Sequence, residues 1–259
     1  MRQFSFVLFF ALFSANAFAD EPAFVTGRPG NTESPIAVPP GHWQIETEIA
    51  SYAHDKQDGV ETNSTSIAAT DFRYGIAHGW DAELIVQPYL HQSVKAGGMK
   101  GSASGVGDVT LRTRRTLMGQ DGDGPALAVI GFVSFPTSQN GLDDDKVEGG
   151  AIITGSTALT KNLSLTGTAG AATISDGAGG REGEYSAGAN LTYALNDKAG
   201  VYGEIFGVRD QHDTKTAATL DFGATYLTSP TTQLDAGVNL GITDSADDCE
   251  VFVGWSHRF

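Results

Sequence analysis

The sequence predicts an all-β fold, a transmembrane antiparallel β-barrel of about twelve strands. Three observations support this prediction. Apolar and polar side chains alternate with a period of two along most of the chain, helical spacing is nearly absent, and long polar connections alternate with short turns. Most of the predicted strands run to roughly ten residues or more, close to the ~9–11 that a tilted strand needs to cross a bilayer.

The composition excludes several classes of protein. The 259 residues carry 31 acidic and 16 basic side chains, a formal net charge of −15, and no basic stripe. Binding to a phosphate backbone depends on clustered Lys and Arg, so a nucleic-acid partner is excluded. The single cysteine, Cys249, rules out an internal disulfide and Cys-rich metal clusters. We therefore expect no cofactor.

The N-terminal residues are typical of a secretory signal peptide. Arg2 precedes an apolar run at residues 4–13, and Ala17-Phe18-Ala19 forms a cleavage pattern before Asp20. The apolar run is too short to span a bilayer, which needs ~20 residues. We expect residues 1–19 to be removed, residues 20–41 to form a periplasmic segment and residues 42–259 to form the barrel, in the outer membrane of a Gram-negative bacterium.

The first predicted strand begins at Trp43 and sets apolar Trp43, Ile45 and Ile49 against polar side chains on the other face. Residues 66–76, 80–89 and 106–117 repeat this pattern. Less regular alternation predicts eight more strands, at residues 125–136, 147–159, 163–173, 184–195, 199–209, 216–227, 233–242 and 250–259.

The connections between these strands alternate in length. Long polar stretches lie at residues 53–65, 90–105, 137–146, 174–183, 210–215 and 243–248, and the turns between them, at residues 77–79, 118–124, 161–162, 196–198 and 229–231, are mostly short. Long extracellular loops and short periplasmic turns are typical of outer-membrane barrels. The alternative is a secreted soluble β-sandwich, which the strand lengths and the loop asymmetry disfavour.

The last strand carries a possible insertion signal. Trp255, His257 and Phe259 share one face and end the chain on an aromatic residue, as in the terminal strands that the barrel-insertion machinery recognises. His257 stands where an aromatic residue is usual. Besides this machinery, the expected partners are outer-membrane lipid and lipopolysaccharide, and we expect a monomer.

Charged residues on the inward parity of the strands are the candidate functional set. They are Asp71, Arg73, Glu83, Asp108, Arg112, Arg114, Glu204, Asp221 and Asp235, while Arg115 faces outward near the periplasmic interface. Two hypotheses stay open: these residues line an aqueous constriction, or they pair into a salt-bridge network that fills the interior.

Catalytic and metal-binding patterns are not found in the sequence. The six histidines fall at strand starts, turns and loops, and no Gly-x-Ser-x-Gly motif accompanies them. Acidic clusters at residues 143–145 and at Asp244, Asp247 and Asp248 lie on predicted outer loops. These clusters are either solvated or bind divalent cations that bridge to lipopolysaccharide phosphates.

Several short motifs carry a resemblance that spans nearly the whole chain after the signal peptide. The stretches RYGI at 73–76, WDAEL at 80–84, GVGDV at 105–109, FPTS at 135–138 and LDAG at 234–237 resemble the outer-membrane family named for the MetA pathway of phenol degradation. The sequence departs from the family pattern at Ser138 and His257.

The resemblance implies an outer-membrane barrel that transports small molecules, in some cases aromatic or other hydrophobic compounds, and it supplies no catalytic residues. We therefore predict a passive channel. The alternatives are a structural or adhesive barrel with a closed lumen and, less favoured, an outer-membrane hydrolase.

Overall fold

The computed structural model describes residues 23–122, 124–142, 146–212 and 215–259. The expected signal peptide and the acidic cluster at residues 143–145 lie outside these ranges. Within them the chain forms fourteen strands, β1 (Trp43–Gln57), β2 (Val60–Ala77), β3 (Trp80–Val86), β4 (Tyr89–Ala96), β5 (Met99–Gly105), β6 (Val109–Met118), β7 (Ala126–Phe135), β8 (Glu148–Ala158), β9 (Leu163–Ser175), β10 (Arg181–Ala194), β11 (Ala199–Asp210), β12 (Ala217–Ser229), β13 (Thr232–Gly241) and β14 (Cys249–Arg258).

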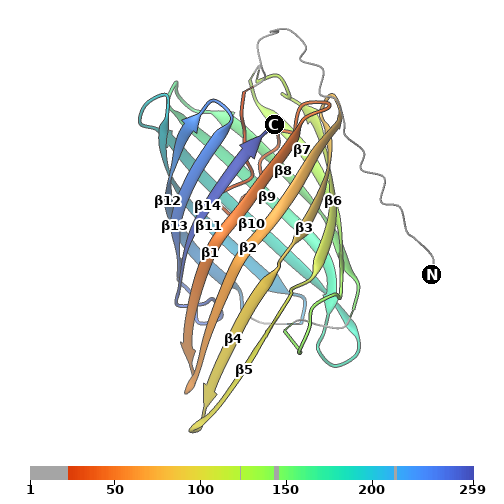
Figure 1. Ribbon diagram of the computed structural model, residues 1–259, viewed down its shortest axis with the longest axis vertical. Coiled ribbons are helices and arrows are strands. Elements are labelled where there is room, and N and C mark those ends of the chain that lie inside the picture. Colours follow the sequence, from red (N-terminus) through yellow and green to blue (C-terminus); the bar gives the residue numbers. More distant parts are fainter. Residues whose placement is uncertain (1–22, 123, 143–145, 213–214) are drawn as a thin grey trace, which may run out of the picture.

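Twelve of these described strands close into an antiparallel barrel, which confirms the predicted fold (Figure 1). The barrel closes where β1 pairs with β14, from Gln44 opposite Arg258 to His54 opposite Cys249. The two other strands, β4 and β5, form a hairpin that pairs with the first part of β2, whereas the last part of β2 pairs with β3. Closure leaves the wall of the barrel without a free edge, as a strand structure in a bilayer requires.

The two ends of the barrel differ in their connections. At the short-turn end, uppermost in Figure 1, β2 joins β3 through two residues, and the Phe259 N–H donates to the Trp43 carbonyl (2.8 Å), so the C-terminus lies there. At the long-loop end the connections after β7, β9, β11 and β13 are longer. This asymmetry matches the sequence prediction.

Two predicted loops at the long-loop end are instead extended hairpins. Residues 53–65 continue β1 and β2 and turn at Asp58 and Gly59, both at positive φ (49° and 81°), which is the Asp-Gly pattern of a tight hairpin turn. Residues 90–105 form the β4–β5 hairpin. The prediction of loops there was wrong because a hairpin that projects beyond the wall needs no continuous apolar face, so the alternation that marks the other strands fades.

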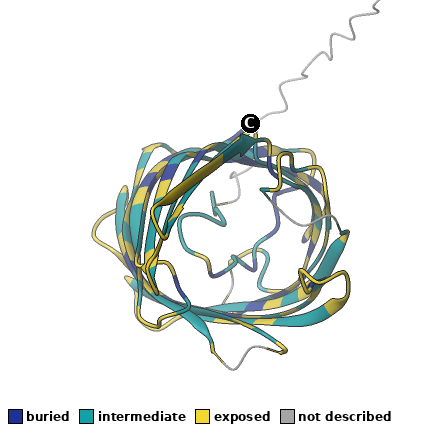
Figure 2. Cartoon of the chain, turned by 90° about the horizontal axis from the view of Figure 1, so that it is seen from below, coloured by how far each residue is buried: buried dark blue, intermediate teal, exposed yellow. Residues whose placement is uncertain are grey.

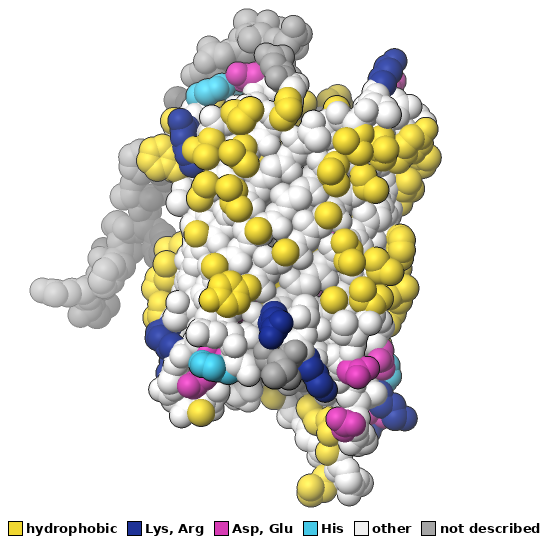
Figure 3. Space-filling model, turned by 180° about the vertical axis from the view of Figure 1, so that it is seen from behind, with side chains coloured by type: hydrophobic (Ala, Val, Ile, Leu, Met, Phe, Trp, Pro, Cys, Tyr) yellow, Lys and Arg dark blue, Asp and Glu magenta, His cyan; other side chains and the backbone are white. Residues whose placement is uncertain are grey.

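The barrel has polar side chains inside and apolar side chains outside. Large apolar residues along the strands are exposed, among them Trp80 and Tyr226. Figure 3 shows apolar side chains spread over the outer wall. The fully buried side chains include Arg73, Asp81 and Arg114. This pattern is expected for a wall in contact with lipid. None of the described residues forms a helix long and apolar enough to cross a membrane.

Candidate functional site

A segment of irregular chain lies inside the barrel, and we call residues 23–38 the plug (Figure 2). Ala37 and Val38, at its end, are 1% and 2% exposed. From the sequence we expected residues 20–41 to lie in the periplasm. Residues 23–38 instead contact lumen-facing side chains of many strands. The physical reason is that the plug pairs its backbone N–H and carbonyl groups with inward charges that the barrel wall leaves incompletely paired.

The first attachment of the plug is a buried ion-pair cluster on β1, β2, β3 and β6. Arg73 lies between Glu46 (2.7 Å) and Asp81 (2.8 Å), and it also donates to the Ile36 carbonyl of the plug (3.1 Å). The Val38 N–H donates to Asp81 (2.8 Å). The cluster therefore fixes the end of the plug against this side of the wall.

Two further arginines of the same cluster hold the plug through Glu33. Arg112 and Arg114 bind the Glu33 carboxylate at 2.5 and 3.1 Å and the Glu83 carboxylate of β3 at 3.1 and 3.0 Å. The contacts with Glu33 are charge-assisted hydrogen bonds, whereas the Glu83 oxygens lie within ion-pair distance of both guanidinium groups. In this structure Arg112 and Arg114 are thus paired with a carboxylate of the wall and with one from the plug.

The second attachment uses three carboxylates on neighbouring strands β11, β12 and β13. One Glu204 oxygen accepts from the Asn31 backbone N–H (2.7 Å), and the other accepts from the Thr32 backbone N–H (2.9 Å) and the Asn190 amide (3.0 Å). Asp221 accepts from the Asn31 side chain (3.1 Å). The third carboxylate, Asp235, binds the Arg28 guanidinium (3.0 Å).

Two cavities lie in the lumen beside these attachments. The short-turn cavity has a volume of about 400 Å³ and is lined by Gly30 and Thr32 among others, and the long-loop cavity has about 310 Å³ and is lined by Asn31. Residues 30–32 therefore lie between the two cavities, and we call them the septum. A Cβ at Gly30 would lie 2.6 Å from the Glu204 carboxylate and 2.9 Å from the Asn190 amide, so a larger residue there would displace the side chains that hold the septum.

The three carboxylate strands show the same order across the septum. On β11, Tyr202 lines the short-turn cavity, Glu204 binds the septum, and Phe206 lines the long-loop cavity. On β12 the residues in the same order are Thr225 at the short-turn cavity, the carboxylate Asp221, and Thr219 at the long-loop cavity. On β13 they are Gln233, Asp235 and Asn239. Glu204 and Asp221 lie opposite each other in the register of β11 and β12, whereas Asp235 lies opposite Thr225, four residues nearer the short-turn end of β13 than the partner of Asp221.

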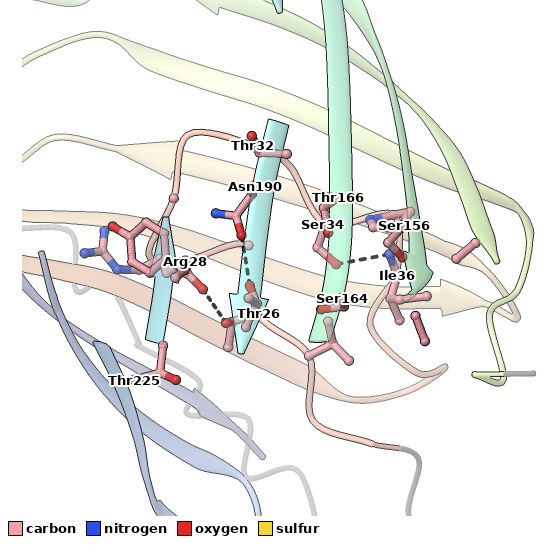
Figure 4. Close-up of a pocket in the computed structure, with 18 of the residues that line it drawn as sticks. Thr26, Arg28, Thr32, Ser34, Ile36, Ser156, Ser164, Thr166, Asn190 and Thr225 are labelled. Atoms are coloured by element: carbon pink, nitrogen blue, oxygen red, sulfur yellow. Dashed lines mark hydrogen bonds between the residues drawn. The ribbon is translucent and has the colours of Figure 1, made fainter. Parts of the chain in front are cut away.

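Figure 4 shows the short-turn cavity between the plug and the wall. Thr26, Arg28, Thr32 and Ser34 come from the plug, and Ser156, Ser164, Thr166 and Asn190 come from β8, β9 and β10. The wall on this side carries uncharged hydroxyl and amide groups, in contrast to the charged wall of β2, β3 and β6.

The remaining sequence-predicted residues lie in two places. Asp71 is in register with Glu46 beside the first attachment. Asp108 lies at the long-loop end of β6 and accepts from the Thr137 and Ser138 N–H groups (3.0 and 2.8 Å), away from the plug. The plug residues Arg28, Asn31 and Glu33 were missed because an irregular segment has no periodicity to read.

The predicted insertion signal forms a continuous aromatic surface on β14. The rings of Trp255 and His257 stack at 5.8 Å, and Phe259 meets His257 edge-on at 4.4 Å. The His257 ring also contacts the Thr232 hydroxyl (2.8 Å). Recognition of this surface by the insertion machinery stays a prediction.

The acidic loop between β13 and β14 packs against the β1 hairpin. The Lys56 N–H donates to Asp248 (3.1 Å), and burial raises the pKa of Asp247, as do the neighbouring Asp55 and Asp248. Among the described residues, no group of three or more His, Cys, Asp or Glu side chains is arranged to hold a metal ion. Cation binding by this loop stays untested.

The fold and the lumen define an outer-membrane β-barrel with an internal plug. The family model for the MetA-pathway of phenol degradation matches residues 26–259, so the chain belongs to this family, as its motifs indicated. None of the curated proteins matches the chain.

Solved structures share the barrel fold. The β-domain of the Bordetella autotransporter BrkA is 13% identical with a TM-score of 0.55, and the match covers 84% of this chain and 98% of that one. The translocator domain of NalP from Neisseria meningitidis is also 13% identical, with a TM-score of 0.53 and coverage of 84% and 88%. The Ralstonia pickettii toluene transporter TbuX is 8% identical, with a TM-score of 0.45 and coverage of 86% and 90%.

Proposed function

We propose that the protein is a passive channel for small molecules in the outer membrane of a Gram-negative bacterium, gated by its own plug. The observation that carries this proposal is the pair of cavities on the two sides of the three-residue septum. A local displacement of residues 30–32 would join them without any change in the barrel wall. The short-turn end then faces the periplasm, as in other barrels of this type.

Three features of the chain support this proposal. The family is named for phenol degradation, which favours aromatic or other hydrophobic compounds as solutes. The hydroxyl-rich wall of β8, β9 and β10 offers these solutes an uncharged surface beside the plug. The septum is held by hydrogen bonds to Glu204, which can break and re-form in a thermal motion, rather than by apolar packing.

The rival is a structural or adhesive barrel whose lumen stays closed. The buried ion pairs that bind Glu33 and Arg28 of the plug favour it, because they resist removal of the whole segment. The two functions differ in conductance, since a permanently closed lumen passes no ions. We propose neither a catalytic role nor catalytic residues: His78 and His212, which pair with carboxylates, are exposed on opposite ends of the barrel.

The membrane context gives the remaining proposed partners. The exposed apolar wall fits outer-membrane lipid, and the acidic loop of residues 244–248 lies at the end that would face lipopolysaccharide. Closure within one chain, through the β1–β14 pairing, makes a monomer sufficient for the proposed channel.

Glu204→Gln is expected to favour the open channel. The two carboxylate oxygens of Glu204 accept the Asn31 and Thr32 backbone N–H groups. In the variant one of these oxygens becomes an NH₂ group, so two hydrogen-bond donors face each other. A hydrogen bond to a charged group contributes about 1.5–3 kcal/mol, so we expect the open probability in planar bilayers to rise about tenfold or more.

Glu250→Gln is the matched control for this variant. Glu250 lines the long-loop cavity and accepts from Asn239 without touching the plug. The open probability of the Glu250→Gln variant is expected to stay at the wild-type value. If the Glu204→Gln variant has the same open probability as wild type, Glu204 does not hold the channel closed.

A further inference from the structure

The outer wall of the barrel carries a groove near the short-turn end, across the neighbouring strands β3, β6 and β7 (Figure 1). Its volume is about 700 Å³. Trp80 and Val129, which line it, are 44% and 38% exposed, whereas their chain neighbours Asp81 and Ala128 are fully buried. This alternation places the groove on the lipid-facing side of the wall, apart from the two cavities of the lumen.

Gly131 of β7 forms the floor of the groove. A Cβ added at Gly131 would meet no atom beyond its chain neighbours within 4 Å, so the missing side chain leaves open space. Val129 and Val133, the outward residues before and after it on β7, are exposed and rise above this floor. The hydrocarbon region of a bilayer holds no water to fill such a recess, so the atoms that pack into it come from a lipid chain.

Trp80 forms one side of the groove and is held in place. Its Nε1 donates to the Thr113 hydroxyl (2.7 Å), which donates in turn to the Asp81 carbonyl (2.9 Å). The indole is therefore fixed against β6 with its ring exposed. Such a tryptophan is typical of the level at which the hydrocarbon meets the headgroups of a membrane.

Arg115 lies at the same level and provides the positive charge of the groove. It is exposed and in register with Trp80 on one side and with Val129 on the other. One Nη atom donates to the His78 carbonyl in the β2–β3 turn (2.7 Å), and no carboxylate among the described residues pairs with the guanidinium. An arginine has five N–H donors, so most of them remain for a ligand.

A cation at the rim of an apolar groove in a membrane complements one kind of molecule, a hydrocarbon chain that carries a phosphate. The planar guanidinium binds phosphate oxygens through two parallel hydrogen bonds. The rim also carries Asp121, which lies 3.6 Å from the His78 ring that lines the groove. A headgroup without net charge therefore suits this rim better than a strongly anionic one.

From this geometry we propose that the groove is a binding site for one phospholipid molecule of the periplasmic leaflet, with its phosphate on Arg115 and one acyl chain on Gly131 beside Trp80. The choice of leaflet rests on the proposed function, in which the short-turn end faces the periplasm. The site itself requires nothing of the lumen. The bound lipid stays with the barrel when the surrounding lipid is exchanged for detergent.

The test is native mass spectrometry of the purified, folded, full-length protein in detergent, titrated with dioleoylphosphatidylethanolamine, dioleoylglycerol and lipid A. One phosphatidylethanolamine molecule per chain is expected to bind about tenfold or more tightly than dioleoylglycerol, which has the same chains and no phosphate. Equal affinity for these two lipids would overturn the phosphate contact. Preferential binding of lipid A would assign the groove to the other leaflet and overturn the proposal.

Two variants separate the contact with the chain from the contact with the phosphate. Gly131→Leu fills the recess, where an added Cβ meets no other part of the wall, and should lower the affinity for both lipids by about tenfold. Arg115→Gln should lower the affinity for phosphatidylethanolamine by about tenfold and leave dioleoylglycerol binding unchanged. A tenfold loss of affinity lowers stability in a bilayer by at most about 1.4 kcal/mol, less than the loss of a buried ion-pair partner.

Two matched substitutions outside the groove serve as controls. Gly167→Leu places the same side chain on the outer wall of β9, where the nearest atom to an added Cβ is 3.8 Å away, and Lys198→Gln removes an exposed cation at the same end of the barrel. Both should bind the lipids as wild type does. If Gly131→Leu binds like Gly167→Leu, or Arg115→Gln like Lys198→Gln, the site is wrong, and either comparison decides if one variant fails to fold.

The titration measures no flux, so failure of the lipid site and failure of the channel are distinguishable. Selective binding of phosphatidylethanolamine by a protein that never conducts would leave the site standing and contradict the proposed function. Conduction by a protein whose lipid binding is insensitive to Gly131 and Arg115 would do the reverse.

Discussion

Deletion of residues 23–38 is expected to turn the protein into a permanently open pore. The plug supplies Arg28, Asn31 and Glu33, which cross the lumen to reach opposite walls. Side chains of β1 and β14 also donate to plug carbonyls, but the ladder that closes the barrel is formed by the backbones of these two strands themselves. We expect mean conductance in planar bilayers to rise by about tenfold or more, since an empty twelve-stranded barrel encloses a continuous aqueous lumen. Liposome swelling should rise in parallel.

A deletion of similar length outside the lumen provides the control. Removal of residues 92–103 shortens the β4–β5 hairpin, which projects beyond the wall at the long-loop end (Figure 1). This variant should keep the conductance of the full chain. If both deletions conduct like wild type, the plug does not obstruct the lumen and the gating account is wrong.

Arg73→Met is expected to lower the free energy of unfolding by about 3–5 kcal/mol, as for other buried pairs from which one partner is removed. Arg73 is 1% exposed and pairs with Glu46 and Asp81, while Glu83 lies 3.6 Å away. Methionine fills much of the volume but leaves these buried carboxylates facing one another with less positive charge. Urea unfolding in lipid vesicles, followed by Trp fluorescence, measures the change.

Arg115→Met separates this effect from a general effect of losing an arginine. Arg115 lies two strands away, on the exposed face of β6, where it donates to the His78 carbonyl (2.7 Å). Its loss should leave stability close to wild type. In addition, Glu46→Gln combined with Arg73→Met should recover part of the lost stability, because it removes one of the stranded charges. An Arg73 variant as stable as the Arg115 variant would show that the cluster is dispensable.

The barrel wall could be predicted from the sequence because lipid imposes a simple rule on it. Each spanning strand must place apolar side chains outward, and the pattern of Trp43, Ile45 and Ile49 records that requirement. The inward charges could be predicted for the same reason, since they occupy the other parity. The pairing of Arg112 and Arg114 with Glu83 follows from their positions on the neighbouring strands β3 and β6.

The plug could not be predicted in this way. Its residues are irregular, and their partners are far away in the chain, as with Asn31 and Glu204. Period-two alternation says nothing about such contacts. One signal was available in retrospect, because β11, β12 and β13 each direct a carboxylate inward, while Arg209, the arginine on those strands, has the opposite parity. A lumen with such an imbalance needs partners from outside the wall.

The most direct test of the gate is a disulfide between the septum and the wall. An added Cβ at Gly188 of β10 would lie 2.9 Å from the Thr32 hydroxyl oxygen, near the roughly 3 Å that disulfide geometry sets between one Cβ and the partner sulfur. The same Cβ would lie 2.5 Å from a ring carbon of Phe206, so this ring must turn aside to admit the new side chain. Thr32→Cys and Gly188→Cys are introduced together with Cys249→Ser, which removes the one native cysteine.

Single-channel recording of this one protein before and after addition of a reductant then measures the role of the septum. We expect no conductance while the disulfide is intact and, after reduction, a return to the conductance of the Cys249→Ser parent. Equal conductance in the oxidised and reduced states would contradict it, because solutes would then cross the barrel without displacing residues 30–32.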